Sequence, residues 1–195
     1  MNTRKIRLIR QKDSMDCGSS CLLMVAMYHG IQPNIEVVRS TCALGKDGVS
    51  LLGISKAAEG IGFKTIGGCL SFVNLIDGAP LPCIVHWNQK HFVVVYKIKK
   101  HRKGRYTIYV ADPGKGLVTY TKEEFCNHWI STRANDEEKG IALLLEPTEQ
   151  FYAQIEIEKA STQNRAKFLW SYLKKYKRFF IQLILGLLLG SLLQL

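Results

Sequence analysis

The chain lacks the cysteine pattern that cross-links small secreted domains. Its six cysteines are scattered and do not fall into the paired spacing of a disulfide framework. The first twelve residues are basic and contain no apolar segment, so they do not resemble a secretory signal. A chain of 195 residues is long enough to bury a core without cross-links. We therefore expect reduced thiols and a cytosolic compartment.

Acidic residues are also scarce, 16 against 27 lysines and arginines, which gives a formal net charge of +11. The excess is not one patch, because residues 151–195 hold seven basic and two acidic residues in under a third of the length. A second basic cluster surrounds an expected turn between strands and lacks the interleaved aromatic residues of nucleic-acid-binding motifs. We expect it to be a solvated hairpin edge, with no nucleic-acid partner. The cluster consists of Lys97, Lys99, Lys100, Arg102, Lys103 and Arg105.

Motifs for metals and nucleotides are missing as well. Cys83, His86 and His91 do not have the spacing of a zinc site, and no fourth ligand accompanies them. The GKG at residues 114–116 lacks the upstream glycine and the following serine or threonine of a phosphate-binding loop. We therefore expect neither a metal nor a cofactor in this chain.

The first sixty residues favour three short helices. The run after Cys17 is apolar on all sides, as in a buried helix, and Gly30 ends it. Asn34 and Ser50 are good N-terminal caps for the next two helices, and Gly60 ends the third.

From residue 63 onward, β-branched and aromatic runs joined by turn signals replace the helical pattern. They predict an antiparallel meander, with a short helix before it and another, opened by a Thr121–Glu124 capping box, within it. Helices first and a sheet afterwards indicate an α+β fold. The expected strands are residues 63–68, 82–87, 91–98, 105–112, 117–120 and 141–146, and the two helices are residues 71–77 and 123–130.

Composition divides the chain into four parts: a domain (1–148), a polar linker (149–164), a basic amphipathic helix (165–178) and an apolar stretch (179–195). The amphipathic helix has an aromatic face and a basic face, which suits an anionic membrane surface. The apolar stretch has no charge, and a membrane-spanning helix needs about 20 such residues. We expect it to be the start of a transmembrane helix in a longer protein. Basic residues before it predict a cytoplasmic domain.

The stretch from Gln11 to Cys21 carries the strongest chemical signal. Asp16 is expected to cap a helix with Cys17 in its first turn, where the helix macrodipole favours a thiolate. Gln11 lies a few residues upstream, where its carboxamide can donate to an oxyanion. Taken alone, Cys17 could equally be a small buried residue. Cys21, one turn further on, is expected to be buried.

A cysteine nucleophile needs a histidine and usually a third group that orients the imidazole. His91 opens the most β-prone strand and Asp112 ends the next one, so antiparallel pairing can bring them together. The residues predict a triad of Cys17, His91 and Asp112, with Gln11 and the Cys17 backbone N–H as oxyanion donors. The alternatives are a histidine satisfied beside a turn and an Asp-Pro-Gly turn former.

Together these motifs resemble the N-terminal peptidase domain of bacteriocin-processing ABC transporters over about residues 8–148. The resemblance implies a papain-like fold with the N-terminal helices against the sheet. It also implies that Cys17 is the nucleophile, His91 its base and acid, Asp112 the orienting group and Gln11 the oxyanion donor. The motifs are, in order, Gln11, DCG at 16–18, Cys21, DGVSL at 47–51, HFVVVY at 91–96 and ADP at 111–113.

The same resemblance implies a cysteine endopeptidase that removes leader peptides ending in two glycines, at the cytoplasmic side of a bacterial cell membrane. The implied partners are the precursor peptide, the transporter's membrane and ATP-binding domains, the lipid bilayer and a second copy of the chain. ATP would bind only in a separate domain. A narrow cleft that excludes any Cβ would suit two glycines. The candidates for a leader groove are the face of the sheet and Leu51, Leu52 and Ile54.

Other functions remain as alternatives. Other Cys-His-Asp acyl transferases are possible by chemistry alone, although the membrane architecture disfavours them, and two further alternatives differ in class. One is a docking domain of the same fold that binds its peptide without cutting it, which the presence of Cys17 disfavours. The other is a membrane-tethered binder of nucleic acid, whose affinity would fall steeply with salt.

Overall fold

The computed structural model describes residues 5–13, 15–42, 49–134, 137–153 and 177–193. The chain divides into two compact units, Met1–Ala153 and Gln154–Leu195. All six cysteines are free thiols.

Three helices form the N-terminal part of the first unit, as the sequence predicts. Gly30 ends the first helix in the left-handed conformation. Asn34 Oδ1 accepts the N–H of Glu36 ahead of the second helix, and Ser50 Oγ accepts the N–H of Gly53 in the third, both at 3.0 Å. The helices are α1 (Cys17–His29), α2 (Ile35–Cys42) and α3 (Leu51–Gly60).

An antiparallel sheet follows, in the order β1-β7-β2-β3-β4-β5, with β6 paired to β7. Strands β2 to β5 form the predicted meander, and Thr121 and Glu124 form the predicted capping box. Strand β6 is an addition to the prediction, because its sequence ISTRA is short and largely polar. The elements are β1 (Phe63–Ser71), α4 (Phe72–Asp77), β2 (Cys83–Trp87), β3 (His91–Lys100), η1 (Arg102–Gly104), β4 (Tyr106–Asp112), β5 (Gly116–Thr121), α5 (Lys122–Trp129), β6 (Ile130–Ala134) and β7 (Glu137–Pro147).

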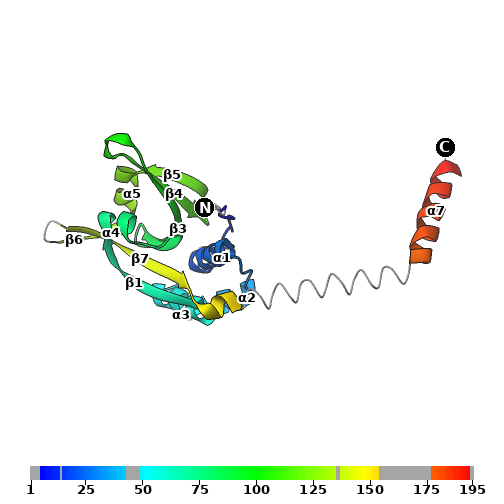
Figure 1. Cartoon of the computed structure of the whole chain (residues 1–195), viewed down its shortest axis with the longest axis horizontal. Helices are drawn as coiled ribbons and strands as arrows, with labels where there is room; N and C mark the ends of the chain where they lie inside the picture. The colour runs from blue at the N-terminus through cyan, green and yellow to red at the C-terminus, as the bar shows by residue number, and fades with distance from the viewer. Residues whose placement is uncertain (1–4, 14, 43–48, 135–136, 154–176, 194–195) are drawn as a thin grey trace. The chain divides into compact units, whose positions relative to one another are not determined.

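Helices lie against both faces of the central strands (Figure 1). Helices α4 and α5 contribute Phe72, Phe125 and Trp129 to a core with Val93 and Val95 of β3. Helix α1 contacts β3 as well. Four successive residues of β3, from 92 to 95, are therefore buried, and this part of the strand is an unbroken apolar run because neither of its faces meets water.

The first unit extends five residues beyond the predicted boundary at residue 148. Thr148 Oγ1 donates to the Gly62 carbonyl at 2.6 Å, and the buried Phe151 ring lies 4.4 Å from that of Phe63. The rest of the predicted linker and most of the predicted basic helix lie outside the described residues. The division of the chain after residue 148 into a linker, a basic helix and the start of a transmembrane helix stays a prediction.

The second unit contributes helix α7 (Lys177–Leu193), which has 17 residues and exposes large apolar side chains. Within the described ranges, no helix is both long enough and apolar enough to cross a membrane.

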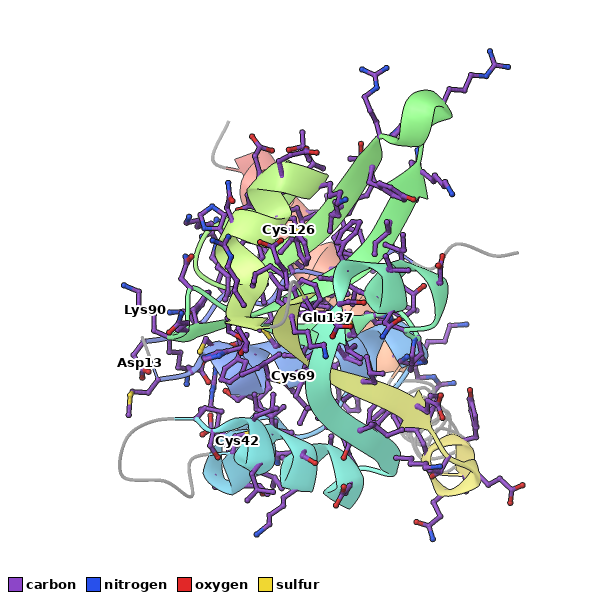
Figure 2. All side chains as sticks on the ribbon, turned by 90° about the vertical axis from the view of Figure 1, so that its left-hand side faces the viewer. Asp13, Cys42, Cys69, Lys90, Cys126 and Glu137 are labelled. Atoms are coloured by element: carbon purple, nitrogen blue, oxygen red, sulfur yellow. The ribbon has the colours of Figure 1, made fainter. Side chains whose placement is uncertain are left out.

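The predicted basic hairpin joins β3 and β4 through η1. In Figure 2 it projects from the body of the domain, with long side chains that point into solvent. Lys97, Lys99, Lys100, Arg102 and Arg105 are exposed there.

Candidate active site

Cys17 is the first residue of α1 and is only 5% exposed, so its thiol lies at the N-terminal end of a buried helix, as predicted. The glycine that follows is required by packing. A Cβ on Gly18 would lie 2.4 Å from Cγ1 of Val49 and 2.7 Å from Cδ1 of Ile54. A larger residue at 18 would therefore push the first turn of α1, and Cys17 with it, away from these side chains.

The prediction that the Asp16 side chain caps α1 is wrong. Its carboxylate instead binds the guanidinium of Arg39 on α2, with Nε–Oδ1 and Nη2–Oδ2 distances of 2.9 Å, and accepts the Lys12 N–H at 3.0 Å. It also accepts the hydroxyls of Ser19 and Ser20. The carboxylate binds Arg39 rather than the backbone N–H groups of α1 because the planar, forked guanidinium matches the geometry of a carboxylate. Burial alone would raise the pKa of Asp16, but these hydrogen bonds and the charge of Arg39 lower it.

Strands β3 and β4 bring His91 and Asp112 together, as predicted. Nε2 of His91 lies 2.9 Å from Oδ1 of Asp112, which is 2% exposed. The same oxygen accepts the N–H groups of Gly114 at 2.8 Å and Lys115 at 3.2 Å. The Asp-Pro-Gly turn and the histidine contact are therefore compatible, since the turn holds the carboxylate that the imidazole meets.

The imidazole of His91 also has the Cys17 side chain as a hydrogen-bond partner. Because Nε2 faces Asp112, Nδ1 is the nitrogen left for the thiol. Burial alone would lower the pKa of His91, but the hydrogen bonds and charges of Asp112 and Cys17 raise it to about 9. Burial alone would raise the pKa of Asp112, and the bonds from His91 and the turn lower it. The site thus holds a protonated imidazole and an ionised carboxylate at neutral pH.

Gln11, in the N-terminal segment before α1, packs against the turn that follows β4. Its backbone N–H donates to the Pro113 carbonyl at 3.2 Å, and its carboxamide lies against Gly114. The next residue, Lys12, binds Asp16, so this short segment connects the turn with the start of α1. Oε1 of Gln11 is buried and makes no hydrogen bond within the described residues. This oxygen can accept an N–H from a ligand, whereas donation to an oxyanion would use the Nε2 end of the carboxamide.

A cavity of about 490 Å³ opens beside Cys17, lined by apolar side chains and by the hairpin between β2 and β3. Leu51, one of the predicted groove residues, lines it. Leu52 is exposed outside it, and Ile54 is fully buried beneath Gly18, so the expectation that Ile54 contacts a leader is wrong.

Cysteine peptidases cleave amide bonds with a thiol, an imidazole that holds its proton and a group that orients the ring. Helix α1 and strands β3 and β4 bring a thiol, an imidazole and a carboxylate together here, an arrangement compatible with that chemistry. More narrowly, the chain belongs to the Peptidase C39 family, whose family model matches residues 5–138.

Relatives of known function agree with this family. The chain is similar to the lactococcin-G-processing and transport ATP-binding protein LagD of Lactococcus lactis (30% identity, 77% of this chain) and to the colicin V secretion/processing ATP-binding protein CvaB of Escherichia coli (28% identity, 77% of this chain). It spans about a fifth of the length of these relatives, 20% in each.

Solved structures agree with the fold. One is a double glycine motif protease from an AMS/PCAT transporter in complex with the leader peptide, at 32% identity and a TM-score of 0.62, covering 74% of this chain and 94% of that one. Another is the peptidase domain of Streptococcus ComA, a bi-functional ABC transporter, at 27% identity and 0.58, covering 74% and 100%. The predicted α+β fold and the predicted family are thereby confirmed.

Proposed function

We propose that this chain is a cysteine endopeptidase that removes double-glycine leaders from precursor peptides, as one part of an ABC transporter that exports them. The observation that carries the proposal is the imidazole of His91, which meets Asp112 through Nε2 and Cys17 as its other partner. The similarity to a double glycine motif protease that holds a leader peptide supports the choice of substrate.

In this mechanism the Cys17 sulfur attacks the carbonyl carbon of the second glycine. His91 passes its proton to the leaving amine, the carbon–nitrogen bond breaks, and an acyl-enzyme forms on the sulfur. His91 then takes a proton from a water molecule, which hydrolyses the acyl-enzyme, while Asp112 holds the ring. The Gln11 carboxamide and the Cys17 backbone N–H stabilise the oxyanion. This arrangement is papain-like, and a substrate without Cβ atoms before the scissile bond can lie close to it.

The surroundings of the domain are part of the same proposal. The apolar stretch that forms α7 would begin a transmembrane helix, and the basic residues before it would place the domain at the cytoplasmic face of a bacterial cell membrane. The remaining partners would be the transporter's membrane and ATP-binding domains and a second copy of the chain. The similarity to LagD and CvaB, which are processing and transport ATP-binding proteins, supports this assembly.

The direct test is to incubate the chain with synthetic precursors that contain a Gly-Gly leader and to weigh the products by mass spectrometry. We expect one cut, after the second glycine. A precursor in which both glycines are replaced by alanine should stay intact, because the added Cβ atoms would keep its main chain away from the sulfur. A protein that binds the precursor and leaves it whole would instead be a docking domain.

Replacing Asp112 with asparagine should lower kcat by about 10²-fold and shift the pH dependence of the reaction. In the wild type, kcat/KM should fall as pH rises through about 9, where His91 loses its proton. Without the carboxylate charge the pKa of His91 is lower, so this fall should begin at lower pH. Rate measurements between pH 6 and 10 on both proteins test this. If kcat/KM fell at the same pH in both proteins, Asp112 would not have the orienting role.

The same shift affects stability. The folded protein holds the His91 proton more tightly than the unfolded chain does. The stabilising contribution is therefore complete below pH 6.5 and is lost as pH rises through about 9. Asp112→Asn should show a smaller loss of unfolding free energy over that range.

Replacing Gln11 with alanine should lower kcat by about 10²-fold with little change in KM, because the carboxamide acts on charge that develops in the transition state. Gln32→Ala is the matched control, since Gln32 is exposed and does not line the cavity. Single-turnover cleavage of the precursor measures the effect. An unchanged rate for Gln11→Ala would remove it from the oxyanion site.

A further inference from the structure

The cavity beside Cys17 contains a second imidazole that the triad does not use. His86 lies on β2 directly across from Phe92 of β3, and both residues line the cavity. The two rings lie 5.0 Å apart between centroids, with an interplanar angle of 32°. Packing on Phe92 therefore holds the His86 ring in place in the cavity that Cys17, the proposed nucleophile, also lines.

Among the described residues, no group forms a hydrogen bond with the ring nitrogens of His86. Within the described part of the chain, His91 binds Asp112, His101 binds Thr107 and His128 binds Asn88, whereas the His86 ring makes no hydrogen bond. The ring is half-buried, so water reaches it only in part. A polar ring in such a position is available to a ligand that enters the cavity.

His86 is also more buried than Gln89 and Lys90, the other polar residues that its hairpin gives to the cavity. Lys90 projects into solvent at the edge of the molecule (Figure 2), and it lines the rim of the cavity. Burial, and then the charge of His91, lower the pKa of His86, which keeps the ring neutral. A neutral imidazole offers one N–H donor and one nitrogen acceptor, the same pair that a peptide unit offers in return.

We infer that His86 is a substrate-binding residue that hydrogen-bonds the main chain of the peptide next to the scissile bond. The inference rests on the proposed function and adds to it a contact that recognises the backbone. Two glycines favour this contact, because a main chain without Cβ atoms can approach the ring closely. Since His91 already transfers the proton, His86 takes no part in the bond-breaking step.

The test compares His86→Phe, which keeps a ring on Phe92 and removes both nitrogens, with His86→Gln, which restores a donor and an acceptor. With a synthetic Gly-Gly leader peptide, we expect His86→Phe to raise KM by about tenfold, the loss of one neutral hydrogen bond, and to change kcat by less than about twofold. His86→Gln should stay within about threefold of the wild-type KM. His101→Phe, on the β3–β4 hairpin, is the matched control and should leave both constants unchanged.

Binding of the same peptide to Cys17→Ala proteins, with and without His86→Phe, separates this inference from the proposed function. A tenfold weaker Kd in the double variant supports the contact, by about the same hydrogen-bond energy. A wild-type Kd or KM for His86→Phe overturns it, and so does a fall in kcat at constant KM, which would indicate proton transfer. A wild-type chain that binds the peptide and never cuts it overturns the proposed function alone.

Discussion

Cys17→Ala is expected to abolish cleavage of a double-glycine precursor, with kcat reduced by at least about 10⁴-fold. The sulfur forms the covalent bond, and no other group in the site can take its place. The nearest alternative is Cys21, which is fully buried and whose thiol donates to the Phe92 carbonyl at 3.3 Å. Burial, and the neighbouring charges of Cys17 and Asp112, raise the pKa of the Cys21 thiol, so it stays protonated.

The measurement is the mass of the products after incubation with the precursor, together with the Kd for the same peptide. We expect Cys17→Ala to keep the Kd of the wild type, because the substitution removes one atom from the edge of the cavity. Cys69→Ala is the matched control, since Cys69 is an exposed thiol on β1, labelled in Figure 2. Undiminished cleavage by Cys17→Ala would show that the peptidase assignment is wrong.

Arg39→Ala is expected to destabilise the first unit by about 3 kcal/mol at neutral pH, because it leaves the Asp16 carboxylate buried without its cation. The side chain of Asp16 is 6% exposed and that of Arg39 is 19% exposed, so water cannot replace the lost contact fully. Urea unfolding at pH 7 measures the change. The matched control is Lys12→Ala, whose exposed ion pair with Glu36 at 3.6 Å should contribute under about 1 kcal/mol.

The effect of Arg39→Ala should depend on pH in a defined direction. The folded protein lowers the pKa of Asp16, so the ion pair stabilises the fold above the ordinary carboxyl range and loses its contribution as pH falls below it. Wild type and Arg39→Ala should therefore converge in acid. A variant that unfolds within about 1 kcal/mol of the wild type at pH 7 would mean that Asp16 finds other partners.

Local rules predicted well where both partners lie close in the sequence. The caps at Asn34, Ser50 and Thr121 follow from side chains that reach the next turn. The pair of His91 and Asp112 was also predictable, because a short turn between antiparallel strands leaves few registers.

Interactions between residues far apart in the sequence explain the predictions that were wrong or incomplete. Asp16 satisfies the capping rule, yet Arg39, 23 residues later on another helix, takes its carboxylate. Nothing in the local pattern indicates which arginine will meet a buried acid. Spacing alone groups His86 with Cys83 and His91 as candidate metal ligands. Side chains alternate along a strand, so residues 83 and 86 lie on opposite faces of β2. The same alternation could have predicted that His86 faces away from the core that buries Cys83.

The place of β7 in the sheet has a consequence for how the domain is made. It is the last strand of the domain in chain order, yet it lies between β1 and β2. A nascent chain on the ribosome therefore holds two open sheet edges until residue 147 has emerged from the exit tunnel. A chain whose synthesis stops before that point has a sheet in two parts with unpaired, aggregation-prone edge strands. A cell would have to bind such a chain with chaperones or degrade it.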